Sequence, residues 1–157
     1  MTPKREYPDL PLIGVGGVVI HEARVLLIRR GAPPLEGQWS IPGGLLEVGE
    51  TLARGVAREL AEETSLDVNV LELIDVFERI QPSTKNVEST PTQNSRPQYH
   101  FVIVDYLCEV RGGTACAGTD ALECAWAKEE ELEKFALNSM TQRALKKAFA
   151  MARARKL

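Results

Sequence analysis

The sequence predicts an α/β protein, and three observations lead to this fold class. Apolar runs with strand character occur on both sides of one strongly amphipathic helical segment, residues 51–64. A second helical pattern closes the chain at residues 139–155. The composition, with 44% apolar and 26% charged residues in a chain of 157, is typical of one globular domain long enough to bury a core. Periodicity alone fits several arrangements of these layers.

The first part of the chain predicts a hairpin followed by a loop. Residues 13–20 and 24–29 are apolar runs, and the short segment 21–23 joins them as a turn. Residues 31–37 contain consecutive prolines and predict a loop. The turn Pro42-Gly43-Gly44 then interrupts regular structure before the helix of residues 51–64 begins.

The second part adds further strands and two helices. We expect Ser139 to be the N-cap of the last helix, whose basic end suits the helix dipole. Residues 81–98 are polar and aperiodic, and a loop of this length is usually either functional or disordered. Two interpretations of it stay open, a lid that contacts substrate and a mobile surface segment. The remaining predicted elements are strands at 68–80, 99–110 and 122–127 and helices at 128–135 and 139–155.

Charge and composition exclude several function classes. A net charge of −3 argues against general binding of nucleic acid, which needs a concentrated basic surface. No apolar run approaches the roughly 18 residues of a membrane span, and the first residues lack the apolar core of a signal peptide. We therefore expect a cytoplasmic protein. Cys108, Cys116 and Cys124 form no Cys-x-x-Cys pair and are expected to be buried free thiols, while His21 and His100 have no metal-ligand spacing.

Acidic residues gather on the helix of residues 51–64. At about 100° per residue, Glu59, Glu62 and Glu63 cluster beside the apolar stripe, and Glu63 lies inside its edge. Burying an ionised carboxylate without a partner is costly, so this position predicts a compensating cation. Mg²⁺ prefers oxygen ligands and usually joins one or two carboxylates to substrate phosphates. The simpler alternative is a solvated acidic face with ordinary ion pairs, which would leave the preceding glycine turn unexplained.

The spacing of these residues resembles the nudix box of the nudix hydrolases. Gly44, five residues, Glu50, seven residues and then Arg58-Glu59-Leu60-Ala61-Glu62-Glu63-Thr64-Ser65-Leu66 match every specified position except Ser65, where the family has glycine. The flanking runs at residues 37–44 and 123–126 also resemble the family. Because glycine adopts left-handed backbone angles without strain, we expect Ser65 to alter the helix cap slightly and to leave the site intact.

The resemblance implies a fold and a set of roles. The fold is the nudix fold, a mixed β-sheet sandwiched between helices (α/β/α), in a single domain over residues 1–157 with the box at residues 44–66. Glu62 and Glu63 are implied to bind Mg²⁺ or Mn²⁺, with Glu59 as a further ligand and Gly44 as a backbone ligand or turn. Arg58 is implied to position these carboxylates, and Glu50 to brace the loop.

The general base is less fixed, because family members take it from the box or from a later loop. Glu123, Asp120 and Glu59 are candidates, and we favour Glu123. For the substrate, an arginine at the end of the strand beside the glycine turn could bind phosphate, and either Arg29 or Arg30 should point away because neighbours on a strand alternate faces. Trp39 could stack on a base, although packing is its expected role.

The spacing of Pro82, sixteen residues after the box, resembles the ADP-ribose pyrophosphatase branch. We therefore predict hydrolysis of ADP-ribose to AMP and ribose 5-phosphate. A pyrophosphatase for oxidised nucleoside triphosphates would use the same acids with another base pocket. A non-catalytic nucleotide sensor on the same fold, and a protein that uses the acidic helix only for interaction, are further alternatives. Family members are often dimers, so a homodimer is also an expectation.

Overall fold

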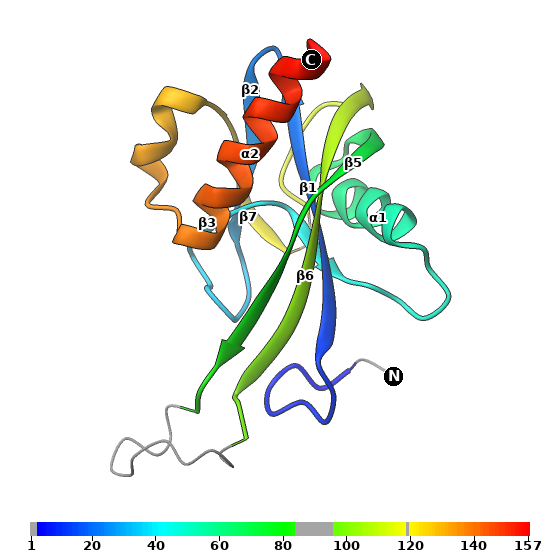
Figure 1. The fold of residues 1–157 in the computed structure, drawn as a ribbon, viewed down its shortest axis with the longest axis vertical. Coiled ribbons are helices and arrows are strands. Elements are labelled where there is room, and N and C mark those ends of the chain that lie inside the picture. Colours follow the sequence, from blue (N-terminus) through cyan, green and yellow to red (C-terminus); the bar gives the residue numbers. More distant parts are fainter. Residues whose placement is uncertain (1–2, 84–95, 119) are drawn as a thin grey trace.

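The computed structural model describes residues 3–83, 96–118 and 120–157 (Figure 1). The predicted hairpin, the long strand after the box and both longer helices are confirmed. Residues 84–95 of the predicted loop lie outside the described residues, so its two interpretations stay predictions. The elements are β1 (Leu12–His21), β2 (Arg24–Arg30), β3 (Trp39–Ser40), β4 (Gly43–Leu45), α1 (Leu52–Thr64), β5 (Asp67–Gln81), β6 (Tyr99–Gly112), β7 (Ala121–Lys128), the 3₁₀ helix η1 (Glu129–Phe135) and α2 (Ser139–Arg155).

The strands form a mixed sheet. Their order is β3-β2-β1-β6-β5, with β4 paired to β1 and β7 paired to β2. β1 and β6 run parallel, whereas the β1–β2, β1–β4, β2–β3, β2–β7 and β5–β6 pairs are antiparallel. α1 and α2 lie on opposite sides of the β1, β6 and β5 strands (Figure 1). The predicted α/β/α arrangement is therefore confirmed.

Strand β1 supplies side chains to two separate cores. Val18 and Ile20 join the core that contains Leu145 of α2, and Val19 joins the core that contains Leu60 of α1. This division follows from the alternation of side chains along a strand. Leu60 and Leu145 are both fully buried, and each contributes about 2 kcal/mol through removal of its side chain from water. One strand thus anchors both helices and fixes the position of α1.

Helix α1 has a defined cap at each end. The Thr51 hydroxyl accepts a hydrogen bond from the Arg54 backbone N–H at 3.3 Å. Ser65 follows the last turn with φ 62° and ψ 15°, and its backbone N–H donates to the Ala61 carbonyl. Ser65 therefore takes the left-handed conformation itself and does not alter the cap, so the helix ends where a glycine would end it.

The N-cap prediction for α2 is wrong by one residue. The side-chain oxygen of Asn138 accepts from the Thr141 backbone N–H at 2.8 Å, and Ser139 is the first residue of the helix. Asparagine caps at least as well as serine, and here it comes first in the chain. Across the described ranges, no helix is long and apolar enough to cross a membrane.

The cysteines are free thiols, as predicted, but they are not all buried. Cys108 lies in the core, Cys124 is half-buried and Cys116 is exposed. Cys116 belongs to the irregular segment between β6 and β7, and it is a member of neither core. The apolar character of cysteine alone could not predict that Cys116 is exposed.

We expect Ser65→Gly to raise the free energy of unfolding by about 1 kcal/mol, because serine is strained in the left-handed region. Urea denaturation would measure this gain. Ser65→Ala is the matched control, because it keeps the strain and removes only the hydroxyl that accepts from the Cys116 thiol. An equal gain in both variants would contradict the backbone explanation.

Candidate active site

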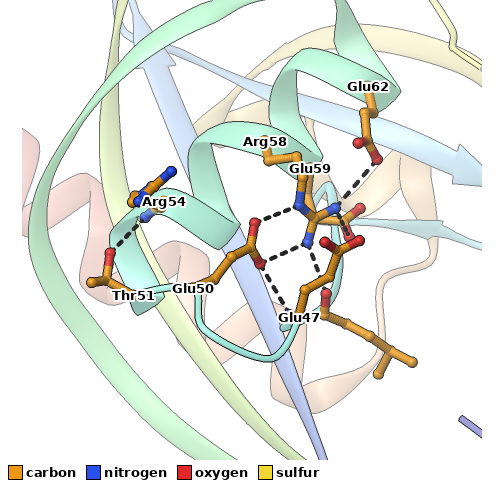
Figure 2. Close-up of polar contacts among 8 residues, drawn as sticks. Glu47, Glu50, Thr51, Arg54, Arg58, Glu59 and Glu62 are labelled. Carbon is orange, nitrogen blue, oxygen red and sulfur yellow. Dashed lines mark hydrogen bonds and ion pairs between the residues drawn. The ribbon is translucent and has the colours of Figure 1, made fainter. Parts of the chain in front are cut away.

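One guanidinium group organises the acidic cluster. Arg58 donates to both carboxylate oxygens of Glu50, at 2.6 Å from Nε and 3.0 Å from Nη2 (Figure 2). Its Nη1 donates to Glu59 at 2.8 Å and to Glu62 at 3.3 Å. Nη2 also donates to the Leu45 carbonyl at 3.0 Å. Arg58 therefore ties the end of β4, the following loop and two turns of α1 into one unit.

Glu50 is held in the ionised form by this contact. The hydrogen bond from Arg58 is the main cause that lowers the pKa of Glu50 to about 2, and the backbone N–H of Glu47 also donates to it, at 3.0 Å. In return, Glu50 is the main cause that raises the pKa of Arg58. Both oxygens of Glu50 are occupied by loop and helix groups, which agrees with the bracing role expected for it.

Glu59 lies against the backbone of the glycine turn. A Cβ placed on Gly44 would stand 2.3 Å from Oε2 of Glu59, so any other residue at this position would push the carboxylate away. Position 44 is therefore a glycine because the carboxylate fills the space of its side chain. Burial is the main cause that raises the pKa of Glu59, and the hydrogen bond from Arg58 opposes it.

Glu63 is the buried carboxylate that the helical pattern predicts. It is only 6% exposed, and it accepts a hydrogen bond from the Gly43 backbone N–H at 2.9 Å. Burial raises the pKa of Glu63 to about 7, the charges of Glu59 and Asp120 act in the same direction, and the Gly43 hydrogen bond and Arg30 oppose them. One backbone donor only partly offsets the loss of water, so a cation beside Glu63 would be strongly favoured.

The donor set fits a hard divalent cation. Glu59, Glu62 and Glu63 offer carboxylate oxygens from one side of α1, and the space over Gly44 lets Glu59 approach the turn. Within the part of the chain that the structure describes, no three His, Cys, Asp or Glu side chains lie close enough together to hold an ion unaided. Mg²⁺ matches this situation, because it commonly takes one or two carboxylates and completes its shell with water and phosphate.

The acidic cluster opens onto a cavity of about 1160 Å³. Burial lowers the pKa of Arg30 in the wall of this cavity, and Arg30 Nε donates to the Pro34 carbonyl at 2.8 Å. The wall thus combines the acids of the box with a cationic group from the end of β2. The predicted residues that line the cavity are Arg30, Gly44, Arg58, Glu59, Glu62, Glu63 and Asp120.

Arg29 and Glu123 lie outside this lining. They occupy opposed positions on β2 and β7, and Arg29 Nη1 donates to Glu123 at 3.0 Å in an exposed ion pair. Arg29 thus points away while Arg30 points in, as strand alternation predicts. The preference for Glu123 as general base gains no support from this position, because its carboxylate is paired across the sheet and away from the cavity.

Trp39 and Pro82 are also absent from the cavity lining. The Trp39 ring packs edge-on against Phe135, with ring centroids 5.1 Å apart, next to the α2 core. This contact agrees with the packing role expected for Trp39. Pro82 is exposed just after the end of β5.

Four charged residues in the cavity wall were missed by the sequence reasoning. Asp105 on β6, Arg79 on β5, Arg5 before β1 and Glu47 after β4 all line the cavity. A usable signal existed for Asp105, which interrupts the apolar series of alternate residues Phe101, Ile103 and Leu107 on its strand. No comparable signal marks Arg5 and Arg79, and only the fold brings them to the site.

Comparisons with known proteins agree with this geometry. The model of the NUDIX domain family matches residues 10–149. An ADP-ribose pyrophosphatase of Methanocaldococcus jannaschii is 32% identical over 82% of this chain and 68% of that protein, and a MutT-like protein of Streptomyces ambofaciens is 32% identical over 81% and 70%. The crystal structure of a MutT NUDIX hydrolase from Burkholderia pseudomallei has a TM-score of 0.72 and 26% identity over 88% of this chain and 98% of that chain. The chain belongs to the nudix family of hydrolases.

Proposed function

We propose that this nudix hydrolase cleaves the pyrophosphate linkage of a nucleoside diphosphate derivative, and that its substrate is ADP-ribose. The observation that carries the proposal is the buried Glu63 beside Glu59 and Glu62 at the wall of a nucleotide-sized cavity. The products would be AMP and ribose 5-phosphate. The activity for which the M. jannaschii relative is named supports this choice of substrate.

Nudix hydrolases generally need a divalent metal, and we propose Mg²⁺ or Mn²⁺ here. Glu62 and Glu63 would hold it, with Glu59 as a further ligand or orienting group and Gly44 offering a backbone oxygen. When bound, such an ion supplies positive charge to the phosphate oxygens and makes an attacking water more acidic.

Arg30 is suited to bind a phosphate of the substrate. Its Nε donates to the Pro34 carbonyl, and neither of its Nη groups donates to a described residue. Arg79 lies in the same cavity wall, where burial is the main cause that lowers its pKa and the positive charge of Arg30 acts in the same direction. A phosphate group between these two arginines would relieve their repulsion, and arginine binds phosphate through two parallel N–H donors.

For the general base we propose Glu59. Of the three candidates, Glu59 and Asp120 line the cavity and Glu123 does not. Arg58 fixes the orientation of Glu59, and burial raises its pKa toward the range that suits a base near neutral pH. Arg58 itself acts as a positioning residue.

A panel of substrates with magnesium tests the reaction. We expect AMP and ribose 5-phosphate from ADP-ribose, separated and identified by chromatography, at a higher kcat/KM than pyrophosphate release from oxidised dGTP. The reverse order would support the triphosphate alternative. Absence of hydrolysis with every compound, in a folded protein that still binds nucleotide, would support the non-catalytic sensor.

We expect Glu62→Gln and Glu63→Gln each to reduce kcat by more than about a hundredfold, because each removes a charged oxygen ligand. Steady-state kinetics and thermal melting would be measured together. Both variants should stay folded: Glu62→Gln should melt close to the wild type, and metal-free Glu63→Gln should melt above it at neutral pH, since its amide oxygen can still accept from Gly43 and no buried charge remains. Glu130→Gln, which changes an exposed acid on η1, is the control and should leave kcat unchanged. Near-normal turnover in either box variant would remove the metal assignment.

The raised pKa of Glu63 predicts a pH-dependent stability in the metal-free protein. The carboxyl group of Glu63 binds its proton more tightly in the folded state than in the unfolded state. The stability that this protonation contributes is therefore fully present below pH 4.5 and is lost as the pH rises to about 7. Glu63→Gln removes the effect, so its stability advantage over the wild type should grow by about 3 kcal/mol across this range.

Urea denaturation in EDTA at several pH values measures this difference. The nearby charges of Glu59, Asp120 and Arg30 remain in both proteins and cancel in the comparison. Added magnesium at neutral pH should stabilise the wild type more than the variant. A difference that is flat between pH 4.5 and 7 would contradict the buried, ionisable state of Glu63.

A further inference from the structure

Asp105 is a buried carboxylate that the reaction described above does not use. It lies on β6, which runs beside β1 in the middle of the sheet (Figure 1). Its side chain is on the same strand face as Phe101 and Ile103, and all three line the cavity. Asp105 is only 5% exposed, and it makes no hydrogen bond or ion pair with any of the described residues. Its free oxygens therefore face the cavity.

The strand beside Asp105 has a glycine at the opposed position. Gly16 of β1 is paired with Asp105 in parallel register, and a Cβ on Gly16 would stand 2.2 Å from Oδ1 of Asp105. The carboxylate therefore extends across β1 into space that any other residue at position 16 would occupy. The nearest apolar neighbour on this side is Ile41, 3.6 Å from the same Cβ position.

Apolar side chains share the cavity lining with Asp105. Ile28, Ile41, Ile103, Phe101 and Met140 belong to its lining. Apolar and aromatic walls with a few polar groups are typical of sites that bind the flat ring of a ligand. Among the polar groups here, Asn138 already uses its side-chain oxygen to cap α2, whereas the oxygens of Asp105 have no such partner among the described residues.

The distance to the metal-binding acids suits a nucleotide. Gly16 pairs with Asp105 on one side and with Gly43 on the other, and Gly43 donates to Glu63. Asp105 and Gly43 are therefore two strand spacings apart, on the order of 10 Å. A nucleoside spans this gap between a base at Asp105 and a phosphate at the box.

A hydrogen-bond acceptor in these surroundings would discriminate strongly between ligands that carry a matching donor and ligands that lack one. Leaving a buried carboxyl unpaired is costly, so a site of this kind rejects ligands that lack the matching donor. Burial, reinforced by the charge of Asp75, raises the pKa of Asp105 to about 7. In either protonation state the carboxyl group keeps an acceptor oxygen.

We propose that Asp105 determines base specificity by accepting a hydrogen bond from the exocyclic amino group of the substrate base, the 6-amino group of adenine. Gly16 makes this possible by leaving the space into which the carboxylate extends. This inference rests on the proposed function, because it assigns the base end of the same cavity whose other end takes the pyrophosphate.

The test compares ADP-ribose with IDP-ribose, whose hypoxanthine base carries an oxygen in place of the 6-amino group. We expect the wild type to favour ADP-ribose in kcat/KM by at least about tenfold. Asp105→Leu should reduce that preference to less than about threefold, and Asp105→Asn should also reduce it, because its amide oxygen can accept from the 6-amino group while its amide NH2 can donate to the oxygen of hypoxanthine. Glu78→Gln changes an exposed acid on β5 that is outside the cavity lining, and it should leave the preference unchanged.

Binding of AMP and IMP, measured by calorimetry on the same four proteins, separates this inference from the proposed reaction. If the wild type hydrolyses neither ADP-ribose nor IDP-ribose, the proposed reaction fails. The wild type should nevertheless bind AMP more tightly than IMP, whereas Asp105→Leu should bind the two with similar affinity. Thermal melting of Asp105→Leu should equal or exceed that of the wild type, because the change replaces a buried carboxyl with an apolar group. Equal wild-type preference for the two bases, or an undiminished preference in Asp105→Leu, would overturn the role of Asp105.

Discussion

The site depends on one charge-balancing interaction, the contact of Arg58 with three carboxylates. Glu50, Glu59 and Glu62 would repel one another at this separation, and the planar guanidinium offers enough donors to meet all of them and the Leu45 carbonyl. A lysine at this position would present a single point charge without that fork. The glycine turn and α1 are consequently held together by the same group that orients the acids.

Arg58 contacts Glu50, Glu59 and Glu62 but not Glu63. Glu50 takes the two-point contact and is kept ionised, whereas Glu63 has only the backbone N–H of Gly43 and the charge of Arg30 to offset its burial. The negative charge of Glu50 in the loop is therefore neutralised, whereas that of Glu63 in the cavity wall is not. That imbalance is what a divalent ion and a phosphate would together correct.

Residue spacing along the sequence could predict part of the fold and of the site. The buried edge position of Glu63 follows from the helical period alone, and the strands of the hairpin follow from their apolar runs. What could not be predicted depends on contacts between distant segments. The Arg29–Glu123 ion pair requires the β2–β7 register, and the cavity position of Asp105 requires the parallel pairing of β1 with β6. The misplaced cap at Ser139 has a different cause, because Asn138 and Ser139 are both good caps and only the observed backbone decides between them.

Glycines along the centre of the sheet explain how acids from different elements reach one cavity. Glu59 of α1 occupies the side-chain space of Gly44, and Asp105 of β6 occupies that of Gly16. Gly43 and Gly16 are themselves paired across β4 and β1. A larger residue at position 16 or 44 would displace a carboxylate and separate the two ends of the cavity. These glycines therefore leave room for the proposed metal-binding acids and the proposed base-binding acid, which lie about the length of a nucleoside apart.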